Sequence, residues 1–161
     1  MQPHMRLRHD MISVFVVRPD ESGSSHEFLQ LHRIAGDYMG GTWQIIRGGV
    51  EGGESYVQAA LRELREEAGL IPAEFYRLGT VETFYTTFED TVWHAPAFCA
   101  MVPRSAIVKL NDEHDGYRWV HRERIDAELM WASERQVLHE LLRDVLDDGP
   151  AKPLLRIALE S

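Results

Sequence analysis

Residues 48–70 read GGVEGGESYVQAALRELREEAGL, a glycine-rich stretch that leads directly into a helical pattern. On a helical wheel at about 100° per residue, the apolar side chains cluster around one direction and should face a core. These side chains are Val57, Ala60, Leu61, Leu64 and Ala68. Gly69 follows the last of them and Pro72 blocks continuation, so the predicted helix ends at Gly69.

The same predicted helix carries Glu63, Glu66 and Glu67 on a separate arc, at spacings i, i+3 and i+4. Their Cβ atoms are expected within about 5–6 Å of one another, where like charges repel. Arg62 and Arg65 point elsewhere on the wheel and are expected to neutralise them poorly. A hard divalent cation, Mg²⁺ or Mn²⁺, would make the cluster favourable because such ions prefer several carboxylate oxygens. A solvated acidic face is the alternative for this helix taken alone.

The loop before the predicted helix adds a second signal. Four glycines occupy residues 48–53, which lets the backbone approach a ligand closely. The N-terminus of the helix that follows favours phosphate. Metal-binding acids beside phosphate-binding amides predict metal-assisted attack on a phosphate chain.

This segment resembles the Nudix box, whose pattern is G-x5-E-x7-R-E-U-x-E-E-x-G-U, where U is aliphatic. Five residues separate Gly48 from Glu54, seven more precede Arg62, and every remaining fixed position up to Leu70 matches. The resemblance implies an α/β fold, the Nudix α/β/α sandwich with a mixed β-sheet between helices. It also implies an enzyme, a Nudix pyrophosphohydrolase that acts on phosphoanhydride bonds with Mg²⁺ or Mn²⁺ as cofactor.

The resemblance assigns roles to the acidic and basic residues of the box. Glu63, Glu66 and Glu67 match the metal-ligand and catalytic glutamates of the family. Arg62 and Glu54 match the pair that holds the loop against the helix, and both count as catalytic-site residues. An ordinary first-turn acid, favoured by the helix dipole, is the alternative for Glu54.

Two further metal-shell groups are implied by the resemblance. Family members tend to place another glutamate on a downstream loop, and Glu113, within residues 111–115, is the candidate. A plain surface acid is the alternative for Glu113. The carbonyl just before the box glycine, here that of Arg47, often joins the metal shell. The predicted metal ligands are thus the side chains of Glu63, Glu66, Glu67 and Glu113.

The chain departs from the family at the entrance of the loop. Many members have Pro-Gly-Gly there, whereas this chain has Ile46-Arg47-Gly48. An arginine suits contact with a substrate phosphate because its fork of donors matches that anion, and an exposed loop arginine is the alternative. The other predicted substrate-binding residues are Arg33, Gly48 and Gly49.

The wider chain, from Ile12 to about Leu146, resembles bacterial dihydroneopterin triphosphate pyrophosphatases and related nucleoside triphosphate members. This implies cleavage of a dNTP or dihydroneopterin triphosphate to a monophosphate and pyrophosphate by metal-activated water. Two other hydrolytic activities are alternatives. Hydrolysis of a dinucleoside polyphosphate is compatible with Tyr85, whereas the lack of proline in residues 82–90 counts against ADP-ribose-type hydrolysis. A catalytically silent nucleotide-binding Nudix domain is the alternative from another class.

The composition limits the setting of this chemistry. The 161 residues suit one domain, assigned to residues 1–148, with a C-terminal tail at 149–161 that is flexible or an edge strand. A net charge of −9 argues against a nucleic-acid partner. No apolar run reaches the about 18–20 residues of a membrane span. Because Cys99 is its one cysteine, the chain is expected to be reduced and cytoplasmic. A homodimer through an edge strand is compatible with the sequence.

Outside the box, the sequence predicts a second helix and several strands. Ser133-Glu134-Arg135-Gln136 has the form of a capping box, with Ser133 as the N-cap. None of the eight histidines shows metal-ligand spacing, and no catalytic role is assigned to them. Strands are predicted at residues 11–17, 27–33, 43–46 and 117–120, and as a hairpin or neighbouring pair within 78–102.

Overall fold

One mixed β-sheet forms the centre of the molecule. The computed structural model describes residues 4–160, and its main sheet contains, in spatial order, β10 (His114–His121), β3 (His26–Arg33), β2 (Met11–Pro19), β9 (Ala97–Met101), β6 (Glu74–Arg77) and β11 (Arg156–Ile157). Two short strands join it, β4 (Trp43–Gln44) beside β3 and β5 (Ile46–Gly49) beside β2. β2 pairs antiparallel with β3 and β5 but parallel with β9, so the sheet is mixed.

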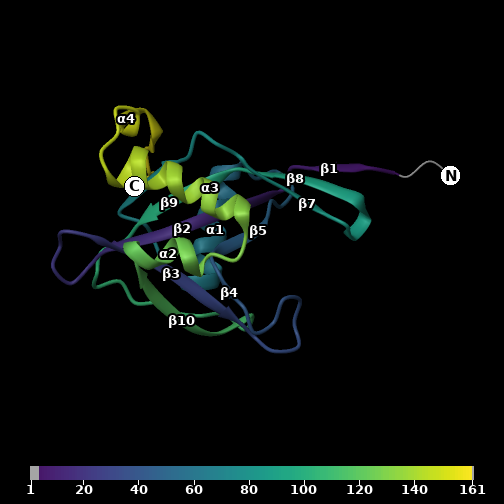
Figure 1. Cartoon of the computed structure of the whole chain (residues 1–161), viewed down its shortest axis with the longest axis horizontal. Helices are drawn as coiled ribbons and strands as arrows, with labels where there is room; N and C mark the ends of the chain where they lie inside the picture. The colour runs from purple at the N-terminus through teal and green to yellow at the C-terminus, as the bar shows by residue number, and fades with distance from the viewer. Residues whose placement is uncertain (1–3, 161) are drawn as a thin grey trace.

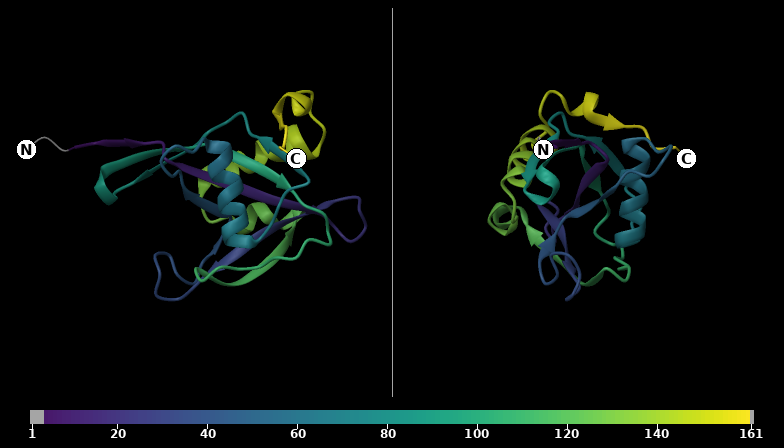
Figure 2. Two further views of the ribbon diagram at one scale, coloured as in Figure 1. Left: turned by 180° about the vertical axis from the view of Figure 1, so that it is seen from behind. Right: turned by 90° about the vertical axis from the view of Figure 1, so that its right-hand side faces the viewer.

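Helices cover both faces of this sheet (Figure 1; right-hand view of Figure 2). They are α1 (Tyr56–Ala68), α2 (Arg122–Glu128), α3 (Ala132–Leu141), its extension η2 (Leu142–Leu146) and α4 (Lys152–Leu155). Ile12 and Val14 of β2 pack into the core under α1, whereas Phe15 and Val17 pack into the core under α2 and α3. The α/β/α sandwich predicted from the sequence is confirmed.

The loop-to-helix junction before α1 is fixed by local hydrogen bonds. Ser55 and Gln58 form a capping box, in which the Gln58 N–H donates to the Ser55 hydroxyl and the Ser55 N–H donates to the Gln58 side chain. At the other end, Gly69 adopts φ 66°, a left-handed conformation that favours glycine. The predicted end of the helix is confirmed.

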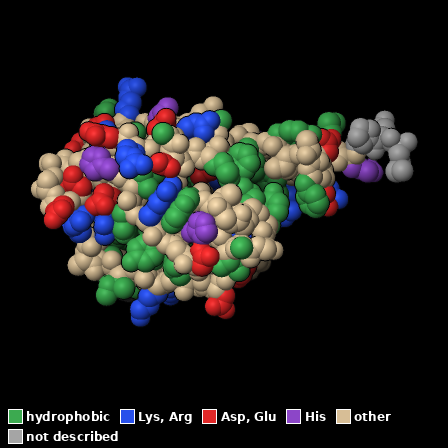
Figure 3. All heavy atoms as spheres, turned by 60° about the horizontal axis from the view of Figure 1, so that its bottom comes forward, with side chains coloured by type: hydrophobic (Ala, Val, Ile, Leu, Met, Phe, Trp, Pro, Cys, Tyr) green, Lys and Arg blue, Asp and Glu red, His purple; other side chains and the backbone are tan. Residues whose placement is uncertain are grey.

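A three-stranded arm projects from the body of the molecule (Figures 1 and 2). It contains β1 (Arg6–Arg8), β8 (Thr91–Ala95) and β7 (Glu82–Thr86), with the short η1 (Phe88–Asp90) at the turn. Figure 3 shows hydrophobic side chains on the surface of this arm. The exposed ones are Leu7, Tyr85, Phe88 and Val92.

The prediction within residues 78–102 is confirmed as a hairpin of β7 and β8. Beyond Pro96 the chain enters the main sheet as β9, so the second half of that segment belongs to a different sheet. Residues 152–157 form α4 and β11, and β11 pairs with β6 at the sheet edge, as in the edge-strand alternative. No helix within residues 4–160 has both the length and the apolar character that a membrane crossing requires.

The predicted N-cap at Ser133 is wrong. α3 begins at Ala132, Trp131 occupies the N-cap position, and no side chain caps the helix there. The Ser133 hydroxyl instead donates to a carboxylate oxygen of Glu82 at 2.7 Å. A buried carboxylate requires hydrogen-bond donors, so this tertiary contact prevails over the local capping pattern.

Candidate metal centre

Arg62 ties the glycine-rich loop to α1. Its guanidinium binds both carboxylate oxygens of Glu54, at 2.8 and 2.9 Å, and donates to the Gly49 carbonyl at 2.8 Å. It also donates to Glu63 at 2.8 Å and to Glu66 at 3.2 Å. The prediction that Arg62 neutralises the glutamates poorly is therefore wrong, because five donors on a long side chain reach across the wheel. The same guanidinium lowers the pKa of the Glu54 carboxyl.

Glu63 packs directly against the backbone of β5. A Cβ atom at Gly48 would lie 2.2 Å from the Glu63 Cδ, so a larger residue here would force the Glu63 side chain out of its position. Burial raises the pKa of Glu63, and its hydrogen bond with Arg62 opposes that rise. The first glycine of the loop and the first glutamate of the acidic arc are thus in direct contact.

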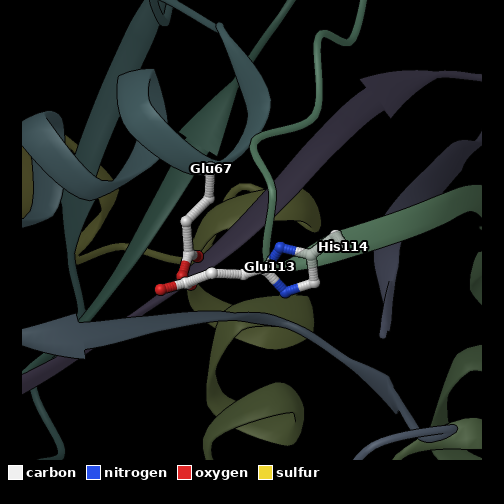
Figure 4. A group of neighbouring side chains, drawn as sticks. All are labelled: Glu67, Glu113 and His114. Carbon is white, nitrogen blue, oxygen red and sulfur yellow. The ribbon is translucent and has the colours of Figure 1, made fainter. Parts of the chain in front are cut away.

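Glu67, Glu113 and His114 come together at the end of α1. One ligand atom from each side chain lies within 4.8 Å of the other two. Figure 4 shows the two carboxylates beside each other, with Glu67 extending from α1 and with Glu113 and His114 at the start of β10. Burial, reinforced by the Glu63 and Glu113 carboxylates, raises the pKa of Glu67 to about 9. Without a cation, this carboxyl group therefore holds a proton at neutral pH.

His114 was missed at the level of sequence. It is buried, and its Nδ1 lies 3.1 Å from the Asn111 side-chain oxygen. Burial and the nearby Arg33 cation lower its pKa, which favours the neutral imidazole that metals bind. Its position next to Glu113 was the available signal, but a single histidine has no spacing pattern to recognise.

Arg33 lies beside this cluster. Its guanidinium pairs with Glu113 at 3.3 Å and with Asp37 at 2.8 Å. The structure therefore brings together Arg33 and Glu113, two predicted site residues that are 80 positions apart in the chain. Glu66 is placed differently, because its side chain is 56% exposed and bonds to Arg62.

Arg47 sends its side chain to the other face of the sheet. It is paired in register with Ser13 of β2, which shares a face with Phe15 on the α3 side. Its guanidinium binds Glu82 at 2.8 Å, while its backbone contacts the Glu67 carboxyl. The structure thus brings the Arg47 backbone, but not its guanidinium, to the predicted metal ligands.

The donor set of this site suits a hard divalent cation. Carboxylate oxygens dominate, with one neutral imidazole, and such ions prefer oxygen ligands. Glu67 is only 4% exposed and forms no ion pair within residues 4–160. A cation at this place would offset the repulsion that raises its pKa.

An α/β/α sandwich in which a glycine-rich loop leads into an acidic helix defines the class of domain to which this chain belongs. Comparison with known families agrees, since the NUDIX domain model matches residues 7–141. The chain belongs to the Nudix hydrolase family, whose members act on phosphoanhydride bonds.

Individual relatives share less than 40% of their residues with this chain over the longer matches. The chain is 32% identical over 123 residues to the asymmetrical bis(5'-nucleosyl)-tetraphosphatase of Sus scrofa, covering 72% of this chain and 80% of the relative. It is 38% identical over 82 residues to an octanoyltransferase of Myxococcus xanthus, but these cover 50% of this chain and only 23% of that protein. The E. coli dihydroneopterin triphosphate pyrophosphohydrolase shares the fold, with a TM-score of 0.68, 22% identity and coverage of 89% and 99% of the two chains.

Proposed function

We propose that this chain is a Mg²⁺-dependent pyrophosphohydrolase that cleaves a nucleoside-triphosphate-like substrate, a dNTP or dihydroneopterin triphosphate, to a monophosphate and pyrophosphate. The observation that carries the proposal is the convergence of Glu67, Glu113 and His114 at the end of α1, while Glu63 of the same helix packs against Gly48 of the glycine-rich loop. Membership of the Nudix family supports it. Mn²⁺ is the alternative cofactor, since it accepts the same ligands.

The side chains of the site have two proposed roles, binding the cation and accepting a proton. When bound, the cation neutralises phosphate oxygens and lowers the pKa of water. Glu63, Glu66, Glu67 and Glu113 are the proposed carboxylate ligands. Arg62 and Glu54 keep the loop against α1, so that the ligands and the phosphate-binding amides hold a fixed spacing. A carboxylate of the cluster accepts the proton of the attacking water.

Arg33 and the loop backbone are the proposed phosphate-binding groups. Arg33 lies next to Glu113 with its fork of donors, and Gly48 and Gly49 leave the backbone open to a ligand. The phosphate contact predicted for Arg47 remains a prediction, and the ion pair of Arg47 with Glu82 competes with it.

A cytoplasmic setting completes the proposal. Cys99 is buried and free, which suits a reducing compartment. The edge-strand homodimer predicted from the sequence remains a prediction.

A dinucleoside polyphosphate is the second candidate substrate. It is favoured by the similarity to the tetraphosphatase of Sus scrofa, which extends over 80% of that enzyme. Both candidates would use the same carboxylate cluster, and they differ in the length of the phosphate chain and in the group at its far end.

The test is a substrate panel with the full chain and Mg²⁺. The panel contains dNTPs, dihydroneopterin triphosphate, ADP-ribose and diadenosine tetraphosphate, and products are separated by anion-exchange chromatography. A Glu67→Gln variant purified in parallel reports contaminating hydrolases. We expect release of pyrophosphate from a triphosphate, whereas preference for diadenosine tetraphosphate supports the second candidate. No turnover above the variant on any compound would identify a catalytically silent domain.

A further inference from the structure

A second charged cluster lies on the α3 side of β5. The Arg47 guanidinium binds Glu82 at 2.8 Å and lies 3.9 Å from Glu134, and Ser133 donates to Glu82 at 2.7 Å. We call these four residues, Arg47, Glu82, Ser133 and Glu134, the Arg47 clamp. They join β5 to β7 of the projecting arm and to α3.

The clamp holds the Arg47 side chain firmly in place. The Glu82 side chain is 1% exposed and that of Arg47 is 23% exposed. The guanidinium also lies 5.2 Å from the centre of the Phe84 ring and 3.7 Å from the Met11 sulfur. Because a buried carboxylate without its cation is strongly unfavourable, Arg47 has little freedom to leave Glu82.

The opposite side of the same strand faces the metal centre. The Arg47 backbone contacts the Glu67 carboxyl, and Gly48 is packed against Glu63 with no room for a Cβ atom. A single strand therefore separates the clamp from two of the proposed metal ligands. A shift of β5 would displace the surface against which both carboxylates are packed.

We propose that Arg47 is a positioning residue, whose clamp on the α3 side fixes β5 against Glu67 and Glu63 and so sets the spacing of the metal ligands. This inference rests on the proposed function, because it presumes that these glutamates bind a cation. Arg47, at the entrance of the loop, would thus act from the α3 side of β5, whereas the substrate phosphates would lie on the α1 side. Direct phosphate contact would require Arg47 to abandon a carboxylate that is 99% buried, since the Glu82 side chain is 1% exposed.

The test measures Mn²⁺ binding to the full chain without substrate, by the electron paramagnetic resonance signal of free Mn²⁺. Arg47→Met is compared with Arg18→Met as a matched control. Arg47 is paired with Ser13 near the start of β2, whereas Arg18 lies near the end of β2. Arg18 also pairs with a largely buried carboxylate, Glu27, and lies over an aromatic ring, that of Trp119. We expect Arg47→Met to weaken Mn²⁺ binding about 10–100-fold, as do other changes behind metal ligands, and Arg18→Met to leave it unchanged.

Two further variants keep the result decisive. If Arg47→Met does not fold, the double variant Arg47→Met with Glu82→Gln removes both charges of the pair and is expected to show the same weakening. Arg47→Lys keeps a cation and should restore part of the affinity. Mn²⁺ affinity equal to that of Arg18→Met in a folded Arg47→Met or double variant would overturn the inference. If wild-type protein itself binds no Mn²⁺, the proposed function fails instead.

Discussion

Two buried groups of carboxylates lie on opposite sides of β5 and differ in how their charge is balanced. On the α3 side, Glu82 has an arginine partner at 2.8 Å and a hydroxyl donor at 2.7 Å. On the α1 side, Glu67 lies beside Glu63 and Glu113 without an ion pair of its own in the described part of the chain, and its pKa rises to about 9. The first group has a cation within the protein, although one oxygen of Glu82 has no hydrogen-bond partner among the described residues, whereas the second is the group proposed to bind an added cation.

Burial of acidic side chains is therefore not by itself a sign of a metal site. Both sides bury glutamates, and burial raises the pKa of Glu134 to about 7 as it raises that of Glu67. What differs is the cation, because Arg47 supplies it on the α3 side. On the α1 side, Arg62 pairs with Glu63 and Arg33 pairs with Glu113, both at the margins. Glu67, at the centre of that side, has no arginine partner within residues 4–160.

The largest expected effect follows from removing charge at that centre. Glu67→Gln and Glu63→Gln should each lower kcat by about 10²–10⁴-fold, because the cation loses a ligand and the water a proton acceptor. Steady-state pyrophosphate release measures this. Glu27→Gln, which alters a carboxylate paired with arginines away from the site, is the control and should retain activity. Wild-type turnover in both site variants would show that the open side is not the catalytic one.

Breaking the link between loop and helix should have the next largest effect. Arg62→Met removes the bonds to Glu54, Glu63 and the Gly49 carbonyl, so the loop no longer holds a fixed distance from α1. We expect a loss of about 10–100-fold in kcat/KM, together with faster hydrogen exchange in residues 49–54. Arg62→Lys keeps the charge without the fork and should recover only part of the activity. A loss of activity with unchanged exchange would place Arg62 in another role.

The pH dependence of stability in the absence of metal tests the raised pKa of Glu67, while Glu134 on the α3 side contributes a smaller loss that is complete near pH 7. The pKa of Glu67 is raised in the folded state, so its contribution to stability is complete at low pH and is lost as pH rises towards about 9. In EDTA, wild-type protein should therefore lose stability between about pH 5 and 9. Glu67→Gln should flatten this loss and melt about 3–6 °C higher than wild type at pH 9.

Added Mg²⁺ provides the control for that prediction. It should raise the Tm of wild-type protein at pH 8 and leave the Tm of Glu67→Gln nearly unchanged, because ligand binding stabilises only the form that binds. Parallel wild-type and variant melting curves across the pH range would contradict the raised pKa.

Most of the site that the sequence predicts is built by local spacing, whereas Glu113 and Arg33, 80 positions apart, were predicted through the family resemblance. Glu63, Glu66 and Glu67 share one helix, and Gly48 and Glu54 precede it, so a helical wheel and a motif suffice. His114 reaches the site only because β10 pairs with β3, and the direction of Arg47 depends on its register with β2. These pairings join residues far apart in the chain, which periodicity cannot reveal.

The fold shows the same division. The buried strand β2 and the end of α1 at Gly69 follow from composition and a turn residue, and both were predicted. β6 and α2 were not predicted, because β6 has four residues and α2 has seven, too few for a clear periodic pattern. Such elements are stabilised mainly by the tertiary contacts around them.

Replacement of Ser133 is expected to have the smallest effect. It tells whether the Ser133 hydroxyl serves the Arg47 clamp, as in the structure, or the capping box that the sequence predicts for the same residue. Ser133→Ala removes the hydrogen bond to Glu82 and should lower the free energy of unfolding by about 1 kcal/mol. A true capping box would make Gln136→Ala costly as well, whereas Gln136 is exposed in α3 and its replacement should change little. Ser55→Ala in the real capping box before α1, measured by urea denaturation beside the other two, should cost about 1 kcal/mol. Equal losses for Ser133→Ala and Gln136→Ala would instead mean that Ser133 caps α3, and Glu82 would then depend on Arg47 alone.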